Sequence, residues 1–186
     1  KNLLQNIEKG PILINVGAHV NYTDPVTGEI WISDQEYRKG AFGYVGGKVY
    51  QRDKNKFQGT ASDIQGTEND PLYQTMRQGI EAYKFDVPNG IYRVTVLFAE
   101  PEFNASEENI YNLSEAQQKE ITGLRSFDIT INGTKVSQDV NLARDYGRIR
   151  AVEKSYRIKT EDNGINVEFR ENSGKSLLSG IKLEKI

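Results

Sequence analysis

Few residues in this sequence could carry out acid–base or nucleophilic chemistry. His19 is the single histidine, the sequence contains no Gly-x-Ser-x-Gly stretch, and no spacing connects His19 to a serine nucleophile. Carboxylate pairs such as Glu100 with Glu102 could act as acid and base, but among 26 acidic residues such pairs arise by chance. We therefore predict no catalytic residue, and we expect His19 to pack or to hydrogen-bond beside a strand end.

Metal and cofactor sites are equally poorly supported. The chain has no cysteine, which removes disulfides and thiolate metal sites and leaves the redox compartment open. Acidic residues do gather at Asp24, Glu29 and Asp34, but they lack the regular ligand spacing of a calcium-binding loop. We predict no metal site and no cofactor.

Aromatic residues in expected loops are the stronger signal, and they favour binding. Tyr and Trp rings offer a flat apolar face to a sugar ring, and neighbouring Asn, Asp, Gln and Glu side chains can bind its hydroxyls. The alternative is that these rings fold back over the ends of the protein, and for any single Tyr both interpretations stay open. The rings concerned are Tyr22, Trp31, Tyr37, Phe42, Tyr44, Tyr73, Phe103 and Tyr111.

Charge and hydropathy argue against two classes of partner. The net charge is -2, and Lys and Arg alternate with Asp and Glu instead of forming a basic stripe, which disfavours nucleic acid. No segment approaches the roughly 18 continuous apolar residues of a membrane span. We expect neither a nucleic-acid nor a membrane partner.

Alternating apolar residues predict strands. Residues 91–100 place Tyr92, Val94, Val96 and Phe98 on one face, and residues 83–87 alternate in the same way. The Pro-Asn-Gly sequence at 88–90 between them predicts a tight hairpin in which the two strands pair.

Two further Asn-Gly turns, at 132–133 and 163–164, mark additional hairpin candidates. Apolar stretches at 12–16 and 181–186 predict that both ends of the chain join sheets. Seventeen Gly and many short polar clusters, most dense in the loop-rich stretch 17–79, favour frequent turns. The prediction is an all-β, antiparallel β-sandwich.

The long connection 101–126 carries the one helix that the sequence predicts, over Ser114–Glu120, with Ser114 as its N-cap. Connections of this length are uncommon unless they are functional or mobile. We expect residues 1–11 to form a linker or N-terminal extension and residues 12–186 to form one domain.

Several strings resemble the malectin and malectin-like family of carbohydrate-binding domains, as found appended to bacterial glycoside hydrolases of the β-galactosidase-like or β-glucuronidase-like kind. The resemblance covers about residues 12–186 and rests on the order and spacing of its strings. The strings are Ile14–Ala18, Gly43–Gly47, Asp70–Thr75 with Arg77, Val96–Glu100 and Phe127–Gly133. The resemblance implies a lectin-like β-sandwich that binds oligosaccharide through loops.

The resemblance also implies a set of site residues. Tyr44 and Phe103 match two of the aromatic positions that contact sugar in animal malectin. The other aromatic positions fall on Gln78 and Glu102, and the aspartate position falls near Asn172. The glucose specificity of animal malectin is therefore not implied for this chain.

The leading hypothesis is a non-catalytic carbohydrate-binding module covalently linked to a glycoside hydrolase in a periplasmic, extracellular or cell-surface setting. Tyr44 and Phe103 would stack on sugar rings, and Tyr111, in the longer connection, would lie near the site. The alternative is a structural or interdomain module that no longer binds sugar.

Overall fold

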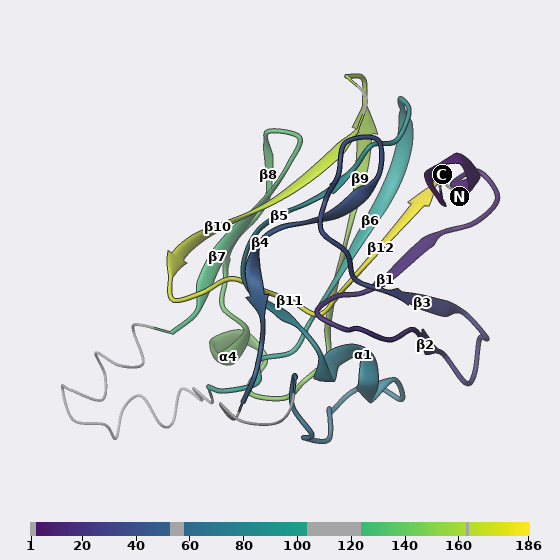
Figure 1. Cartoon of the computed structure of the whole chain (residues 1–186). Helices are drawn as coiled ribbons and strands as arrows, with labels where there is room; N and C mark the ends of the chain where they lie inside the picture. Colours follow the sequence, from purple (N-terminus) through teal and green to yellow (C-terminus); the bar gives the residue numbers. More distant parts are fainter. Residues whose placement is uncertain (1–2, 53–57, 104–123, 163) are drawn as a thin grey trace.

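Two six-stranded sheets, packed face to face, make up most of the protein (Figure 1). The structure is a computed structural model that describes all residues except 1–2, 53–57, 104–123 and 163. Its first sheet runs in the order β2 (Tyr22–Thr23), β3 (Ile30–Ser33), β1 (Ile12–Asn15), β12 (Gly180–Lys185), β6 (Gly90–Phe98) and β9 (Val152–Thr160).

The second sheet runs in the order β11 (Leu177–Leu178), β5 (Arg77–Phe85), β10 (Ile165–Ser173), β7 (Ser126–Ile131) and β8 (Thr134–Val140), with β4 (Phe42–Val49) also paired to β5. Its described strands pair antiparallel, and in the first sheet β1 and β3 form the one parallel pair among the described strands. The predicted all-β, antiparallel sandwich is confirmed.

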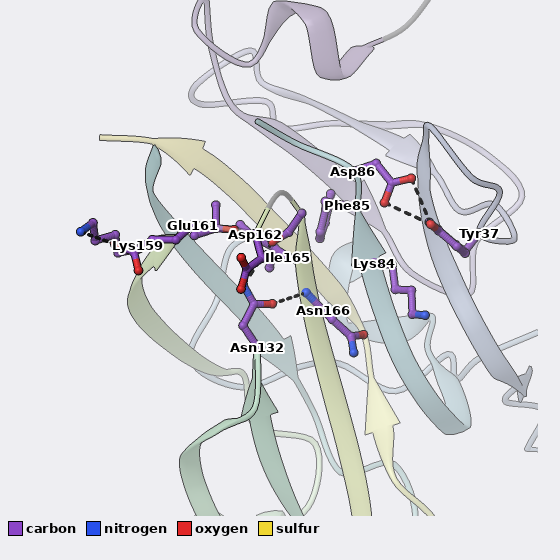
Figure 2. Close-up of a pocket in the computed structure, with 12 residues that line it drawn as sticks. Tyr37, Lys84, Phe85, Asp86, Asn132, Lys159, Glu161, Asp162, Ile165 and Asn166 are labelled. Atoms are coloured by element: carbon purple, nitrogen blue, oxygen red, sulfur yellow. Dashed lines mark hydrogen bonds and ion pairs between the residues drawn. The ribbon is translucent and has the colours of Figure 1, made fainter. Parts of the chain in front are cut away.

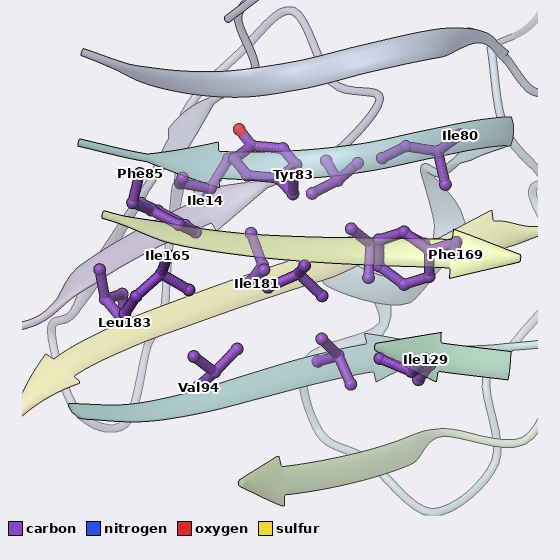
Figure 3. Close-up of a cluster of buried hydrophobic side chains, with 14 of the residues drawn as sticks. Ile14, Ile80, Tyr83, Phe85, Val94, Ile129, Ile165, Phe169, Ile181 and Leu183 are labelled. Carbon is purple, nitrogen blue, oxygen red and sulfur yellow. The ribbon is translucent and has the colours of Figure 1, made fainter. Parts of the chain in front are cut away.

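The core lies between the sheets, where alternate residues of facing strands interdigitate (Figure 3). On β6, Tyr92, Val94, Val96 and Phe98 are each 0% exposed, as their alternation predicts. Each such side chain contributes about 1.5–3 kcal/mol when it is fully buried. This buried row explains why the strand prediction for residues 91–100 was accurate.

Both ends of the chain join the first sheet, as predicted. β1 pairs with β12, with Ile14 opposite Ile181. The residues before β1 also contact the domain: η1 (Leu3–Asn6) is a 3₁₀ turn, and Leu4 and Ile7 are buried in the core. Whether residues 1–11 also serve as a linker stays a prediction.

The predicted pairing across residues 88–90 is wrong. β5 and β6 belong to different sheets, and the chain crosses from one to the other between Phe85 and Gly90. Gly90 does not adopt the positive φ that a tight hairpin would need. Alternation shows that each of the two strands buries one face. It does not show whether the strands are neighbours in one sheet or face each other across the core from two sheets.

Of the other Asn-Gly turns, one forms a hairpin and one does not. Asn132 and Gly133 adopt φ of 48° and 82° and join the paired strands β7 and β8. Gly164 also has a positive φ, of 89°, but it lies between β9 and β10, which belong to different sheets. Gly164 thus has the positive φ predicted for it, whereas Asn163 lies outside the described residues and the predicted hairpin does not form.

Among its described residues, the region 17–79, expected to be rich in loops, contains β2, β3, β4, a helix and the start of β5. β4 carries three glycines in eight residues, which hides its alternation. The helix α1 (Asp70–Gln74) begins with a proline in its first turn, a position that proline tolerates. α4 (Leu142–Asp145) is a further short helix. The helix predicted over 114–120 lies outside the described residues, and none of the described helices is long and apolar enough to span a membrane.

Candidate functional site

Most of the site residues implied by the resemblance lie near one end of the second sheet. Gln78 pairs with Leu177 of β11, directly after the turn 173–176. Glu102 and Phe103 follow β6, and Asn172 is at the end of β10. Tyr111 lies outside the described residues. We call this region, where residues 100–103 meet Arg125 and the turn 173–176, the Arg125 end.

A buried ion pair organises the Arg125 end. Arg125 Nε lies 2.8 Å from Glu100 Oε2, and the two side chains are 2% and 0% exposed. Such a pair offsets its desolvation cost only when further hydrogen bonds complete it. Here Arg125 Nη1 donates to the carbonyl of Lys175 at 2.6 Å, and Glu100 Oε1 accepts from the backbone of Glu102 at 3.1 Å. The pair therefore ties the 100–103 turn to the 173–176 turn.

Phe103 and Glu102 project from this fixed turn toward solvent. The Phe103 ring is 37% exposed, and the Arg125 guanidinium lies 5.9 Å from its centroid. The Glu102 side chain is 39% exposed, with one carboxylate oxygen 3.9 Å from Arg125. Burial, together with the charges of Glu102 and Glu100, raises the pKa of the neighbouring Tyr50 to about 12, so this phenol remains a neutral hydrogen-bonding group. The turn thus presents one apolar ring and one carboxylate.

A cavity of about 400 Å³ lies beside Gln78. It is lined by Gly47, Lys48, Gln78, Gly79 and Lys175. Gly47 and Gly79 have φ of 78° and 71°, and a side chain on Gly47 would meet the Gln78 carbonyl at 2.8 Å. A side chain on Gly47 would therefore clash with the β5 backbone, so glycine at this position lets β4 approach β5 closely beside the cavity. The volume of the cavity lies within the range of ligand pockets.

Tyr44 belongs to a different set of contacts. It lies on β4 opposite Tyr83, and the Arg77 guanidinium covers one face of its ring, 3.3 Å from the centroid. Arg77 in turn contacts the buried Asp34, which also accepts a hydrogen bond from the Tyr83 hydroxyl at 2.9 Å. Burial raises the pKa of the Asp34 carboxyl, although its hydrogen bonds oppose the shift. One face of the half-buried Tyr44 ring is thus already occupied.

Asn172 is exposed and held by a neighbouring carboxylate. Its Nδ2 donates to Asp128 Oδ1 at 2.8 Å. Asp128 also accepts from the Asp139 backbone N–H and from Lys135, and these bonds hold the pKa of its carboxyl well below the usual range. A charged Asp128 therefore fixes the orientation of the Asn172 amide.

Of the rings expected in loops, Trp31, Phe42 and Tyr73 are buried, at 4–6% exposure. These three serve packing, as the alternative interpretation held. His19, expected beside a strand end, lies close to Gln58, with its Nε2 2.7 Å from the Gln58 amide nitrogen. Within the part of the chain that the structure describes, no group of three His, Cys, Asp or Glu side chains is placed to hold a metal ion.

Arg125 was missed by the sequence reasoning. The available signal was a pair of charges at the ends of two apolar strands: Glu100 follows Val96–Ala99, and Arg125 precedes Ser126–Ile131. Charges at strand ends are common on protein surfaces, and nothing in the spacing of 25 residues reveals that these two are buried together.

The fold and the geometry of the Arg125 end define a class: an antiparallel β-sandwich domain with a ligand-sized cavity and an exposed ring at one end. A profile of the malectin domain matches residues 12–182. The chain therefore belongs to the malectin domain family. No curated protein matches the chain.

Solved structures extend this comparison. The chain is similar to β-glucuronidase from Bacteroides uniformis, with 30% identity and a TM-score of 0.80, over 98% of this chain and 19% of that chain. It is also similar in fold to the extracellular domain of ANXUR2 from Arabidopsis thaliana, with 19% identity and a TM-score of 0.65, over 94% of this chain and 48% of that chain. This chain thus spans about a fifth of the length of the β-glucuronidase it matches.

Proposed function

We propose that this chain is a non-catalytic carbohydrate-binding domain that binds an oligo- or polysaccharide at the Arg125 end. The observation that carries the proposal is the exposed Phe103 ring on a turn fixed by a buried ion pair. Arg125 of that pair also binds the carbonyl of Lys175, which lines the cavity of about 400 Å³. An aromatic face suits the C–H face of a sugar ring, and nearby amide and carboxylate groups suit its hydroxyls. Membership of the malectin family supports the ligand class.

Each side chain has a distinct part in this proposal. Phe103 stacks on a sugar ring, while Glu102, Gln78 and Asn172 exchange hydrogen bonds with its hydroxyls. Tyr44 lies opposite Tyr83, five positions along β5 from Gln78, so it contacts only a ligand that extends along the sheet, and only with the ring face that Arg77 leaves open. Tyr111 remains a candidate contact from the connection that follows Phe103.

The domain is further proposed to be an accessory part of a bacterial glycoside hydrolase outside the cytoplasm. Its similarity to about a fifth of a Bacteroides β-glucuronidase, and to plant ectodomains, supports this setting. Linked to a catalytic domain, a binding domain raises the effective concentration of polymeric substrate without chemistry of its own.

A glycan array followed by calorimetry tests the binding proposal. Phe103→Ala should weaken the best glycan by about 2- to 12-fold, since an aromatic contact contributes about 0.5–1.5 kcal/mol. Ile30→Ala is the control, because Ile30 is an exposed apolar side chain, 55% exposed, on β3 in the other sheet. Equal losses in both variants, or no bound glycan at millimolar concentration, would favour a purely structural module.

A second experiment tests the accessory role. Removing this domain from the full-length hydrolase should slow hydrolysis of an insoluble or polymeric substrate and leave a soluble chromogenic substrate unaffected. An equal loss on both substrates would indicate that the domain stabilises the enzyme instead of delivering it to the polymer.

A further inference from the structure

A second cavity, of about 420 Å³, lies at the opposite end of the same sheet (Figure 2). It is formed by the last residues of β5, the first residues of β10, the β7–β8 turn and Tyr37. Gln78 and Lys84 stand six positions apart on β5, which places the two hollows about 20 Å apart at about 3.3 Å per residue. We call this region, where Asn132, Asn166 and Tyr37 meet, the Asn132 end.

Side-chain hydrogen bonds hold the walls of this cavity in place. Asn132 Oδ1 accepts from the Asn166 backbone N–H at 2.8 Å, and Asn132 Nδ2 donates to the Gly164 carbonyl at 3.1 Å. On the other side, the Tyr37 hydroxyl donates to the Asp86 carboxylate, whose oxygens lie 3.0 and 3.1 Å away. The backbone N–H of Gly40 binds the same carboxylate. The cavity walls are therefore held in place by the protein's own hydrogen bonds, and the cavity is pre-formed.

One polar atom of this wall lacks a partner. Asn166 Oδ1 is buried and accepts no hydrogen bond within the described part of the chain. Leaving such an acceptor unsatisfied costs about 1–3 kcal/mol. Because this oxygen has no exposed surface, a ligand in the cavity can reach the Asn166 amide only through Nδ2, which donates to Glu168 Oε1 at 2.8 Å in an exposed hydrogen bond. The second N–H of this amide favours a ligand with acceptor oxygens.

The charges of the lining favour a neutral ligand. Lys84 and Lys159 are positive, whereas Asp86, Glu161 and Asp162 are negative. The carboxylates would repel a strongly anionic ligand, and the ammonium groups would repel a strongly cationic one. An apolar ligand would displace water from the charged groups of both signs, which costs free energy. Hydroxyl groups both donate and accept, so a polyhydroxylated neutral molecule matches charges of both signs.

Two aromatic residues line this cavity, Tyr37 and the buried Phe85. Tyr37 lines the cavity, and the Lys84 ammonium lies 5.3 Å from the centroid of its ring. We infer that the Asn132 end is a second binding site, which takes a neutral saccharide between Tyr37, Lys84 and Asn166. This site uses none of the residues of the Arg125 end and can exist whether or not that end binds sugar.

Titration of the ¹⁵N-labelled protein tests this site separately from the first. The probes are maltotriose, cellotriose, laminaritriose and mannotriose as neutral sugars, with trigalacturonate as an anionic and triglucosamine as a cationic comparison. At least one neutral probe should produce saturable shifts in the amide signals of residues 84–86 and 164–166. Signals of Gln78, Glu102 and Phe103 report on the Arg125 end in the same spectra.

Two variants identify the site. Asn166→Ala and Lys84→Met should each weaken the neutral probe by about 2- to 12-fold, the worth of one hydrogen bond of about 0.5–1.5 kcal/mol. Asn21→Ala is the matched control, because Asn21 is an exposed asparagine that binds one backbone N–H in the other sheet. Absence of shifts at the Asn132 end, tighter binding of a charged probe, or no loss in either variant would overturn the inference.

Discussion

The two ends of the second sheet are held together by different means. At the Arg125 end, an ion pair that is at most 2% exposed joins two turns through the carbonyl of Lys175 and the backbone of Glu102. At the Asn132 end, a single neutral amide side chain joins the β7–β8 turn to Asn166 and Gly164. One end therefore relies on a buried ion pair, and the other on part-exposed hydrogen bonds, those of the Asn132 amide and those of Tyr37 with the Asp86 carboxylate.

This difference determines how each end should respond to substitution. Removing one member of a buried pair leaves an uncompensated charge, which costs several kcal/mol. Removing a neutral hydrogen bond near the surface costs about 1 kcal/mol. A single substitution in the ion pair at the Arg125 end should therefore lower the free energy of unfolding by several kcal/mol, whereas loss of one hydrogen bond at the Asn132 end should lower it by about 1 kcal/mol.

The largest expected effect is that of Arg125→Met. The unpaired Glu100 should lower the free energy of unfolding by about 3–5 kcal/mol, measured by urea denaturation at pH 7. The double variant Glu100→Leu with Arg125→Met removes both charges and should recover much of that loss. A loss below about 1 kcal/mol in the single variant would contradict the role given to this pair.

A smaller effect is expected at the other end from Asn132→Gly. Glycine keeps the positive φ of this position, so the variant loses only the two side-chain hydrogen bonds, at about 1–2 kcal/mol in total. Asn132→Ala should lose about 1–2 kcal/mol more, because alanine is strained in the left-handed region. Equal stabilities of the two variants, from the same denaturation assay, would show that the backbone conformation contributes nothing here.

Lowering the pH should reduce the free energy of unfolding through protonation of Asp128, the carboxylate that holds Asn172. The hydrogen bonds from the Asp139 backbone, Lys135 and Asn172 hold the folded-state pKa of Asp128 well below its unfolded value, which is near 3.9. This contribution to stability is present above about pH 4 and is lost as the pH falls toward the folded-state pKa. Because Lys135 is half-exposed, solvent screens part of the effect.

Denaturation of wild type and Asp128→Asn between pH 2 and 6 measures this contribution. The stability of the wild type should fall more steeply with acid than that of the variant. Parallel curves would mean that Asp128 titrates alike in the folded and unfolded states.

The smallest effect on stability is expected from Glu102→Gln. Its carboxylate is 3.9 Å from Arg125 and more than a third exposed, so the free energy of unfolding should change by less than about 0.5 kcal/mol. Sugar affinity, measured by calorimetry, should still change if Glu102 contacts the ligand. A stability loss comparable to that of Arg125→Met would show that Glu102 belongs to the buried pair.

Much of the frame could be predicted from the sequence, because burial on one face of a strand imposes alternation. The core row of β6 and the terminal strands β1 and β12 were found in this way. Alternation does not say which sheet a strand joins, so the β5 and β6 pairing was wrong. In β4, three glycines interrupt the pattern, and the strand was missed.

The site was less accessible to prediction, for a different physical reason. The resemblance pointed to Gln78, Glu102 and Phe103, all of which lie at the Arg125 end, but their roles in binding remain predictions. Arg125 itself could not be found, because the burial of a charge depends on partners that only the folded chain brings together. Turns can be predicted because they depend on residues that are adjacent in sequence. The ion pair cannot be predicted in this way, because it joins two turns that are far apart in sequence.

The most direct test of the account is an NMR titration of the ¹⁵N-labelled domain with the glycan that binds best on the array. The account predicts saturable shifts in the signals of Gln78, Gly79, Glu102 and Phe103, and Phe103→Ala should weaken this binding while leaving the rest of the spectrum unchanged. Absence of shifts at these four residues, with glycan binding seen elsewhere or not at all, would contradict carbohydrate binding at the Arg125 end.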